Sequence, residues 1–483
     1  MEPSIAGALI CCGLFAVAWW VSEVPVVVAL VASLAFGSTA IVTLSALGGS
    51  SPMIYVVFLF ALLASVALRR DFMRQLGTVL AEQPVAWIIL ILIAYTIVGA
   101  ILLPRMFEGE ATVFVPAREQ KRIAEVPLVP VAGNITQALY FVLSALAFFA
   151  MSILLKRRGA LKALRFGFFG WALLNIGMAF LDLFGKAAGL GDILAPIRSA
   201  TYAMLTEAEV AGFFRIAGGY SEASAFGATT VVLLAFTFTY WRSTRDRFAF
   251  ALTVVLLALV ILSTSSTAYG ALGVLGLALG ISIARAALQN RLQAQDLLVI
   301  AGGIVVIGLA VGVFLHNNNA LDPLWHLFDT MVLDKSSSES AQERAYWNLK
   351  SLESLYDTGG LGIGLGSSRA SSWVIAVLSQ FGIIGSLMIG YLTVLIVRGR
   401  KLRQSRELDL ETRATILSMT SASIAALVSS SISGGGADPG IIFFLTLAVV
   451  ATYRRGAIEG YRPAPAAAPS WASSGALSGR RLA

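Results

Sequence analysis

The sequence predicts an all-α polytopic membrane protein with about 12–13 transmembrane helices and a large external loop. Hydrophobic residues make up 57% of its 483 residues and charged residues only 13%, whereas soluble proteins carry about a quarter charged residues. Apolar runs of about 20 residues, enough to cross a hydrocarbon core of ~30 Å, recur from end to end. The runs lack the short alternating pattern of membrane barrels, so they are expected to be helices.

The apolar runs define the expected spans in chain order. The first run is not expected to be a cleaved signal, because no basic segment precedes it and another run follows directly. If every run crosses the membrane, the N-terminus is external, whereas a half-buried first hairpin would leave one crossing fewer. The expected spans are residues 4–22, 25–44, 52–68, 85–103, 134–155, 166–184, 225–240, 248–263, 266–284, 297–315, 373–397, 414–431 and 440–453.

The distribution of Lys and Arg predicts the orientation of the chain. One set of segments between spans is basic and the set that alternates with it is neutral or acidic, so the positive-inside rule assigns the basic set to the cytoplasm. The formal net charge of +8 is therefore a topology signal, and no nucleic acid partner is expected. The basic segments are 69–75, 156–165, 241–247, 285–296, 398–413 and 454–483. The external segments are 104–133, 185–224, 316–372 and 431–439.

Residues 1–461 are expected to form a single transmembrane domain that includes the external loops. The Pro/Ala/Ser-rich residues 462–483 are expected to be a disordered cytoplasmic tail. The two cysteines, Cys11 and Cys12, are adjacent within a span and predict no disulfide. The two histidines lack companion ligands, so neither a metal site nor a cofactor is expected.

The loop 185–224 carries the first candidate for catalysis. Arg215 precedes Gly218 and Gly219, which would let a substrate approach the backbone closely, and Glu222 follows at the mouth of the next span. An arginine at the membrane interface is commonly a snorkelling anchor, but this one stands on the side where cations are sparse. The pair of Arg215 and Glu222 fits either an acid/base pair in an active site or a simple ion pair.

The loop 316–372 is the longest hydrophilic interval of the chain. Residues 340–356 have the apolar spacing of an amphipathic helix, which could lie along the membrane surface or merely cap the bundle. On this helix, Arg344 is favoured as a phosphate ligand, because a planar guanidinium binds phosphate oxygens in a bidentate manner. Lys350 is favoured as a solvated side chain.

A Gly-rich turn, GGLGIGLGSSR, follows this helix at 359–369. Its backbone amides around Gly364 and Gly366, with Ser367 and Ser368, could cradle a phosphate. The turn is no P-loop, since the GK[ST] ending is missing, and no dinucleotide fingerprint, since no strand precedes it. A connector that returns the chain to the membrane explains the composition equally well.

Two shorter external turns complete the set of candidates. The hydroxyls of residues 263–267 lie at a tight hairpin between spans, where they could bind sugar or satisfy the backbone. Asp438, next to Pro439, is favoured as an Asx-type cap of the last span.

Taken together, these motifs resemble the superfamily of Wzy-type O-antigen and exopolysaccharide polymerases and O-antigen ligases. RIAGGYSEAS resembles the family's external Arg–x–x–Gly motif, and LSTSSTAYGAL resembles its Ser/Thr-rich hairpin. ERAYWNLKSL, GGLGIGLGSS and LSQFGIIG resemble, in order, its arginine on an aromatic helix, its Gly-rich turn and its following span. The resemblance covers approximately residues 210–390, and the rest matches in topology alone.

The resemblance implies a GT-C-like membrane glycosyltransferase that moves a glycan from undecaprenyl diphosphate onto a sugar hydroxyl, without a metal. Arginines would stabilise the diphosphate, with Arg215 and Arg344 as first choices and Arg369 as the third. Glu222 is the preferred general base, ahead of Asp357 and Glu343. The active site would face the periplasm from the bacterial inner membrane. Implied partners are an undecaprenyl-diphosphate-linked oligosaccharide, the lipid bilayer, a chain-length regulator and a flippase. The expected substrate-binding residues are Arg369, Arg198, Lys335, Ser367, Ser368, Gly364, Gly366 and Tyr220.

One departure separates the two branches of the superfamily. The ligases carry a histidine just after the Gly-rich turn, where this chain has Ser371 and Ser372, while His316 and His326 lie upstream. The sequence therefore favours a polymerase of a surface polysaccharide over a ligase that transfers glycan to lipid A core. A flippase or transporter is the third alternative. It is less favoured, because charged residues within the spans are scarce and no internal repeat is evident.

Overall fold

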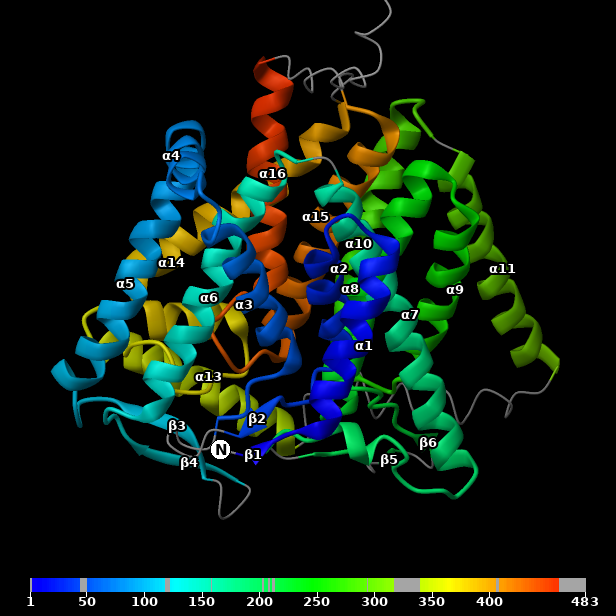
Figure 1. Cartoon of the computed structure of the whole chain (residues 1–483). Helices are drawn as coiled ribbons and strands as arrows, with labels where there is room; N and C mark the ends of the chain where they lie inside the picture. The colour runs from blue at the N-terminus through cyan, green and yellow to red at the C-terminus, as the bar shows by residue number, and fades with distance from the viewer. Residues whose placement is uncertain are drawn as a thin grey trace, which may run out of the picture.

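In the computed structural model the chain is a bundle of helices with small two-stranded sheets at one end (Figure 1). The structure describes residues 2–43, 50–117, 122–157, 159–201, 204–206, 209–210, 213–292, 294–316, 339–404 and 408–459. Within these ranges, seven helices are long and apolar enough to cross a membrane, and six shorter apolar helices accompany them. The expected all-α, multi-pass membrane architecture is thereby confirmed.

Each expected span coincides with one of these apolar helices. The long helices are α5 (Pro84–Met106), α6 (Ala132–Leu154), α7 (Ala160–Ala187), α8 (Ala223–Thr244), α10 (Ser266–Leu288), α14 (Trp373–Arg398) and α15 (Leu410–Ser433). The shorter ones are α1 (Ile5–Val21), α2 (Pro25–Ala32) with η1 (Ser33–Ala35), α3 (Ile54–Ala67), α9 (Arg247–Leu262), α11 (Ala294–His316) and α16 (Ile441–Glu459). The second run, 25–44, is helical only as far as Ala35, where Phe36 leaves helical geometry.

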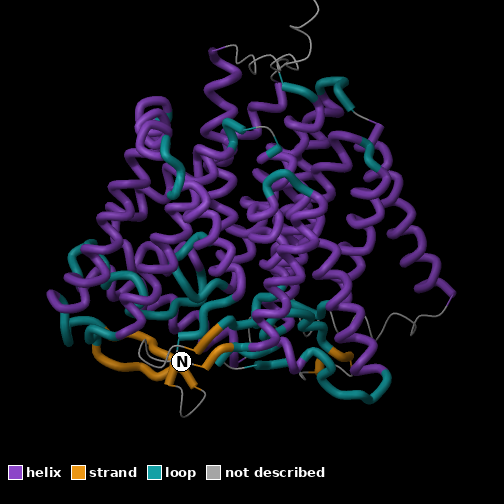
Figure 2. Tube along the Cα trace, in the orientation of Figure 1, coloured by secondary structure: helices purple, strands orange, loops and turns teal. Residues whose placement is uncertain are grey.

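The two ends of the bundle differ in structure, as Figure 2 shows. One end, which we call the strand end, carries all the described strands, the N-terminus and α13 (Glu339–Asp357). The opposite end, the α4 end, carries α4 (Phe72–Glu82) and the η6 turn (Gly399–Gln404). The antiparallel pairs are β1 (Glu2–Pro3) with β2 (Val42–Thr43), β3 (Thr112–Ala117) with β4 (Arg122–Pro127), and β5 (Glu209–Val210) with β6 (Phe213–Phe214).

The helices are held together by close packing of aromatic side chains. Phe168 of α7 and Phe236 of α8 stack with ring centroids 4.2 Å apart. Phe141 of α6 contacts Phe381 of α14 at 5.3 Å and Phe444 of α16 at 5.6 Å. Because lipid tails are as apolar as these side chains, packing of this kind has to supply much of the association between helices.

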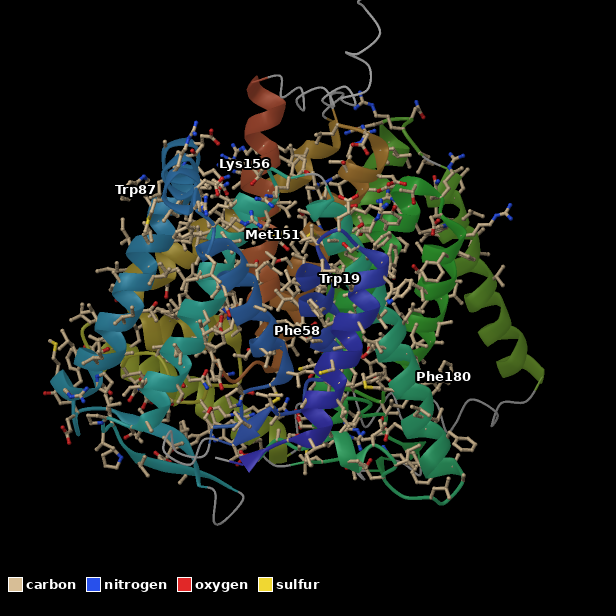
Figure 3. All side chains as sticks on the ribbon, viewed as in Figure 1. Trp19, Phe58, Trp87, Met151, Lys156 and Phe180 are labelled. Carbon is tan, nitrogen blue, oxygen red and sulfur yellow. The ribbon has the colours of Figure 1, made fainter. Side chains whose placement is uncertain are left out.

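Polar and aromatic anchors mark the α4 end. Figure 3 shows Lys156 and Trp87 toward this end of the bundle. Lys156 forms an ion pair with Glu82 at 2.9 Å, and the indole of Trp87 donates to the carbonyl of Leu80 at 3.1 Å. Tryptophan and basic side chains are enriched at the boundary between membrane and water, so these residues fit the headgroup level of a bilayer.

Candidate functional site

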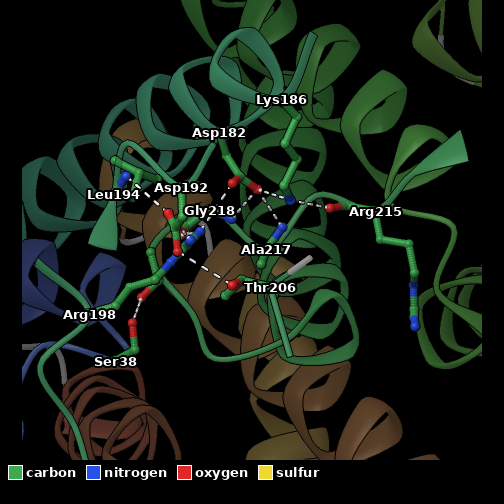
Figure 4. A network of polar contacts seen from close by, with 11 residues as sticks. Ser38, Asp182, Lys186, Asp192, Leu194, Arg198, Thr206, Arg215, Ala217 and Gly218 are labelled. Carbon is green, nitrogen blue, oxygen red and sulfur yellow. Dashed lines mark hydrogen bonds and ion pairs between the residues drawn. The ribbon is translucent and has the colours of Figure 1, made fainter. Parts of the chain in front are cut away.

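The loop before α8 is fixed by a buried carboxylate, Asp182, which lies near the end of α7 (Figure 4). Its side chain is 1% exposed, and it accepts hydrogen bonds from Lys186 Nζ at 3.1 Å and Arg198 Nη2 at 3.2 Å. It also accepts the main-chain N–H groups of Ala217 at 2.8 Å and Gly218 at 3.1 Å. One buried anion therefore ties two cations and the loop backbone to α7.

The same network sets the position of Arg215. Lys186 Nζ donates to the Arg215 carbonyl at 2.6 Å, and Arg198 Nη2 donates to the Gly218 carbonyl at 2.6 Å. Gly218 has a φ of +54°, which favours glycine. The main chain is thus held on both sides of Arg215, while its guanidinium points away from the network (Figure 4).

The guanidinium of Arg215 is uncommitted. Its Nε is buried without a hydrogen-bond partner, and among the described residues Arg215 forms no ion pair. Burial lowers the pKa of Arg215, and the charge of Glu222 opposes this shift. A guanidinium stays protonated despite such a shift, so Arg215 is a partly buried, fixed positive charge with capacity to bind an anion.

Glu222 lies near Arg215 but does not pair with it. Its backbone is extended at the start of α8, and its carboxylate accepts a hydrogen bond from Ser224 at 2.5 Å. The simple ion pair, one of the two interpretations open from the sequence, is therefore absent from this described pair. The remaining interpretation needs a base within reach of a substrate, and the partly exposed Glu222 satisfies the condition of access.

Arg198 and Tyr220, two of the expected substrate ligands, are engaged in contacts within the protein. Arg198 is buried and forms ion pairs with both Asp182 and Asp192. The buried Tyr220 donates its hydroxyl to the carbonyl of Leu34 at 3.0 Å and accepts the Trp171 indole N–H at 3.1 Å. Burial raises the pKa of Tyr220, so its hydroxyl keeps its proton. These side chains position the loop and offer little to a ligand.

The Gly-rich turn makes the contacts of a connector, one of the two interpretations that the sequence left open. Its amides mostly donate within the protein: Ile363 to the Ser379 carbonyl at 2.9 Å, Gly364 to the Gln380 carbonyl at 3.1 Å, and Gly366 to Gln380 Oε1 at 2.8 Å. Most of the donors that would hold a phosphate are therefore used. The carbonyls of Ser379 and Gln380 are free to accept these hydrogen bonds because the helix α14 is interrupted at Gly382, which has a φ of +63°.

Ser367 and Ser368 belong to the same connection. The buried Ser367 hydroxyl donates to the Ile363 carbonyl at 2.7 Å and accepts from Asn134 at 2.8 Å. The Ser368 hydroxyl accepts the N–H of Phe114 at 3.0 Å. These hydroxyls tie the turn to α6 and β3.

We expect Gly366→Ala to destabilise the fold more than Gly359→Ala. Both glycines have positive φ, which costs an alanine about 1–2 kcal/mol. A Cβ at position 359 meets open space, whereas one at 366 would clash with the carbonyl of Gly133 on α6. Overpacking adds about 1–3 kcal/mol. Unfolding in detergent with increasing denaturant measures the difference, and equal losses for the two variants would contradict this packing.

Pairwise contacts connect the remaining motifs near the strand end. Thr267, in the Ser/Thr-rich hairpin, is hydrogen-bonded to Ser433 at 2.9 Å. The side chain of Arg369 lies against Gly435 in the turn after α15, and the Trp373 indole donates to the Ala437 carbonyl at 3.2 Å. Arg369 itself is exposed. The structure thus joins the hairpin, the turn after α15 and the end of the Gly-rich turn.

Helix α13 packs beside β3 through aromatic contacts. The Phe114 ring lies 5.9 Å from that of Tyr346 and 6.2 Å from that of Trp347. Lys350 forms an ion pair with Glu353 at 2.6 Å. Arg344 is partly exposed and has no ion pair to any described residue. Arg344 therefore remains available to an anion, while Lys335 lies outside the described residues.

Asp438 forms the turn that the sequence predicts. Its Oδ1 accepts the Gly440 N–H at 2.8 Å, so the expected Asx-type turn is present. Burial raises the pKa of Asp438 to about 6. Within the described ranges, no three His, Cys, Asp or Glu side chains gather as a metal site would require.

Comparison with protein-family models and with curated protein sequences gives no match to this chain. The functional argument therefore depends on the residues and their geometry.

Proposed function

We propose that the chain is a membrane glycosyltransferase that polymerises a bacterial surface polysaccharide. Its donor is an oligosaccharide linked to undecaprenyl diphosphate, and its acceptor is a sugar hydroxyl of another lipid-linked repeat unit. The single observation that carries the proposal is Arg215, a partly buried cation held by its backbone, with a buried Nε that lacks a partner. In this proposal the protein lies in the bacterial inner membrane and the strand end faces the periplasm.

The reaction breaks the bond between the anomeric carbon and the diphosphate. The acceptor oxygen attacks that carbon, its proton passes to a carboxylate base, and the lipid diphosphate leaves with the bonding electrons. Negative charge grows on the leaving diphosphate, and a preorganised guanidinium stabilises such charge most strongly where water is scarce. Arg215 supplies this stabilisation, and Arg344 and Arg369 contribute further positive charge at the strand end.

Glu222 is assigned as the base that receives the acceptor proton. We expect Glu222→Gln to lower polymer extension about 10²-fold, since general base catalysis contributes at least that factor. The measurement is the length distribution of polymer made from a purified lipid-linked repeat unit. Glu108→Gln, an exposed glutamate at the strand end, serves as the control and should keep full activity. Full turnover by Glu222→Gln would make the carboxylate structural.

Asp438 gives the protein a predictable dependence of stability on pH. The folded protein holds this proton more tightly than the unfolded chain, because burial raises the pKa of Asp438 from 3.8 to about 6. Stability from this group is therefore lost as the pH rises through that interval. Asn keeps an acceptor for Gly440 but does not titrate, so Asp438→Asn should lose less stability than the parent when the pH rises from 4 to 7. Thermal unfolding of both proteins at pH 4 and pH 7 measures this. The same difference in stability between variant and parent at both pH values would contradict it.

A further inference from the structure

Two adjoining cavities lie at the α4 end, away from the residues assigned to catalysis. The first, about 720 Å³, is lined mainly by α8, α9, α10 and α15, and side chains such as Leu234, Leu257 and Leu272 make its walls largely apolar. The second, about 740 Å³, lies beside η6 and the end of α10. Arg242 and Arg400 line both, so an apolar compartment opens into a cationic one.

The cationic compartment has more positive charge than its carboxylate can neutralise. It is lined by four arginines and a single acidic residue, Asp296. Arg242 forms an ion pair with Asp296 at 2.5 Å. The other three, Arg285, Arg291 and Arg400, have no ion pair with any residue that the structure describes. Three guanidinium groups thus line the second cavity, and no carboxylate of a described residue pairs with them.

One wall of the apolar cavity is a helix that faces outward. Only 11% of the apolar stretch of α10 is buried within the protein, the smallest share among the seven long helices. Most of α10 would therefore meet bilayer lipid. The apolar cavity is therefore bounded on this side by a helix that faces outward.

We propose that the paired cavities bind an anionic glycerophospholipid. Its phosphate lies among Arg285, Arg291 and Arg400, because guanidinium groups match phosphate oxygens in charge and geometry. An acyl chain fills the apolar compartment. Basic pockets between transmembrane helices recognise anionic headgroups in this way.

The occupant is distinct from the glycan donor of the proposed reaction. Arg242 and Glu222 are at opposite ends of α8, whose length at 1.5 Å per residue separates them by about 30 Å. A phosphate bound at the α4 end therefore cannot also bind Arg215. The lipid site is independent of the proposed function.

Native mass spectrometry of the full-length protein tests this site with added phosphatidylglycerol, phosphatidylethanolamine and undecaprenyl phosphate. We expect phosphatidylglycerol to bind at least 10-fold more tightly than phosphatidylethanolamine. Ala278→Trp, which fills the boundary between the cavities, should abolish that preference. Leu277→Trp, at the exposed neighbouring position of α10, should retain it. Equal binding of the two phospholipids, or tight binding of undecaprenyl phosphate alone, would overturn the proposal.

A charge variant keeps the test decisive if the tryptophan variant fails to fold. The triple substitution of Arg285, Arg291 and Arg400 by Gln should remove the preference for phosphatidylglycerol. Arg70→Gln, an exposed arginine at the same end that lines neither cavity, should leave it unchanged. Retained preference in the folded triple variant would contradict the assignment of the headgroup compartment.

Discussion

Replacement of Arg215 by alanine will lower polymer extension to between about one hundredth and one thousandth, while the protein stays folded. Removal of one preorganised donor to a developing anion costs about 10²–10³-fold in rate. Arg215 has no ion pair with a described carboxylate, so its loss leaves no described carboxylate without a counter-charge. The measurement is polymer length and initial rate from a purified lipid-linked repeat unit, with thermal unfolding as the check on folding.

Two further variants make the Arg215 test specific. Arg215→Lys keeps the charge but loses the planar fork, so it should recover only part of the rate. Arg105→Ala removes an exposed arginine at the end of α5 toward the strand end and should have little effect. Polymer of normal length from folded Arg215→Ala would remove the basis of the proposed function.

Replacement of Asp182 by alanine will destabilise the protein by about 3–5 kcal/mol, the usual cost of leaving a buried partner charge uncompensated. Lys186 would lose its carboxylate, and Arg198 would keep only Asp192. The N–H groups of Ala217 and Gly218 would also lose their acceptor. Denaturant unfolding in detergent measures the loss.

The matched controls for Asp182 separate charge from shape. Asp182→Asn keeps an acceptor for the main chain but lacks the charge, so its loss should be smaller than that of alanine. Asp357→Ala, on an exposed side chain at the end of α13, should change stability little. Asp182→Ala and Asp357→Ala with equal stability would contradict the role of the buried network.

The helices could be predicted because hydropathy is a local property of the sequence. Each apolar run of sufficient length has to become a helix in lipid, and the structure contains a helix at each expected span. The break at Gly382 was not predictable in this way. Its positive φ and the insertion of the Gly-rich turn against it depend on residues near 360, which only the fold brings into contact.

The candidate site could be predicted in part for the same reason. Arg215 and Glu222 were identifiable because an uncompensated cation and a carboxylate stand close together at the start of a span. The role of Asp182 was not predictable, since its partners at 198, 217 and 218 are distant in sequence. Arg198 was expected to bind substrate, although the carboxylates around it give it a structural role.

The most direct test of the central claim is analysis of lipid-linked glycans in a bacterial strain that lacks this protein. A polymerase joins repeat units, so its loss should leave single repeat units on undecaprenyl diphosphate, and restoring the chain should recover long polymer. Accumulation of long, unattached lipid-linked polymer would indicate a ligase instead and would contradict the account.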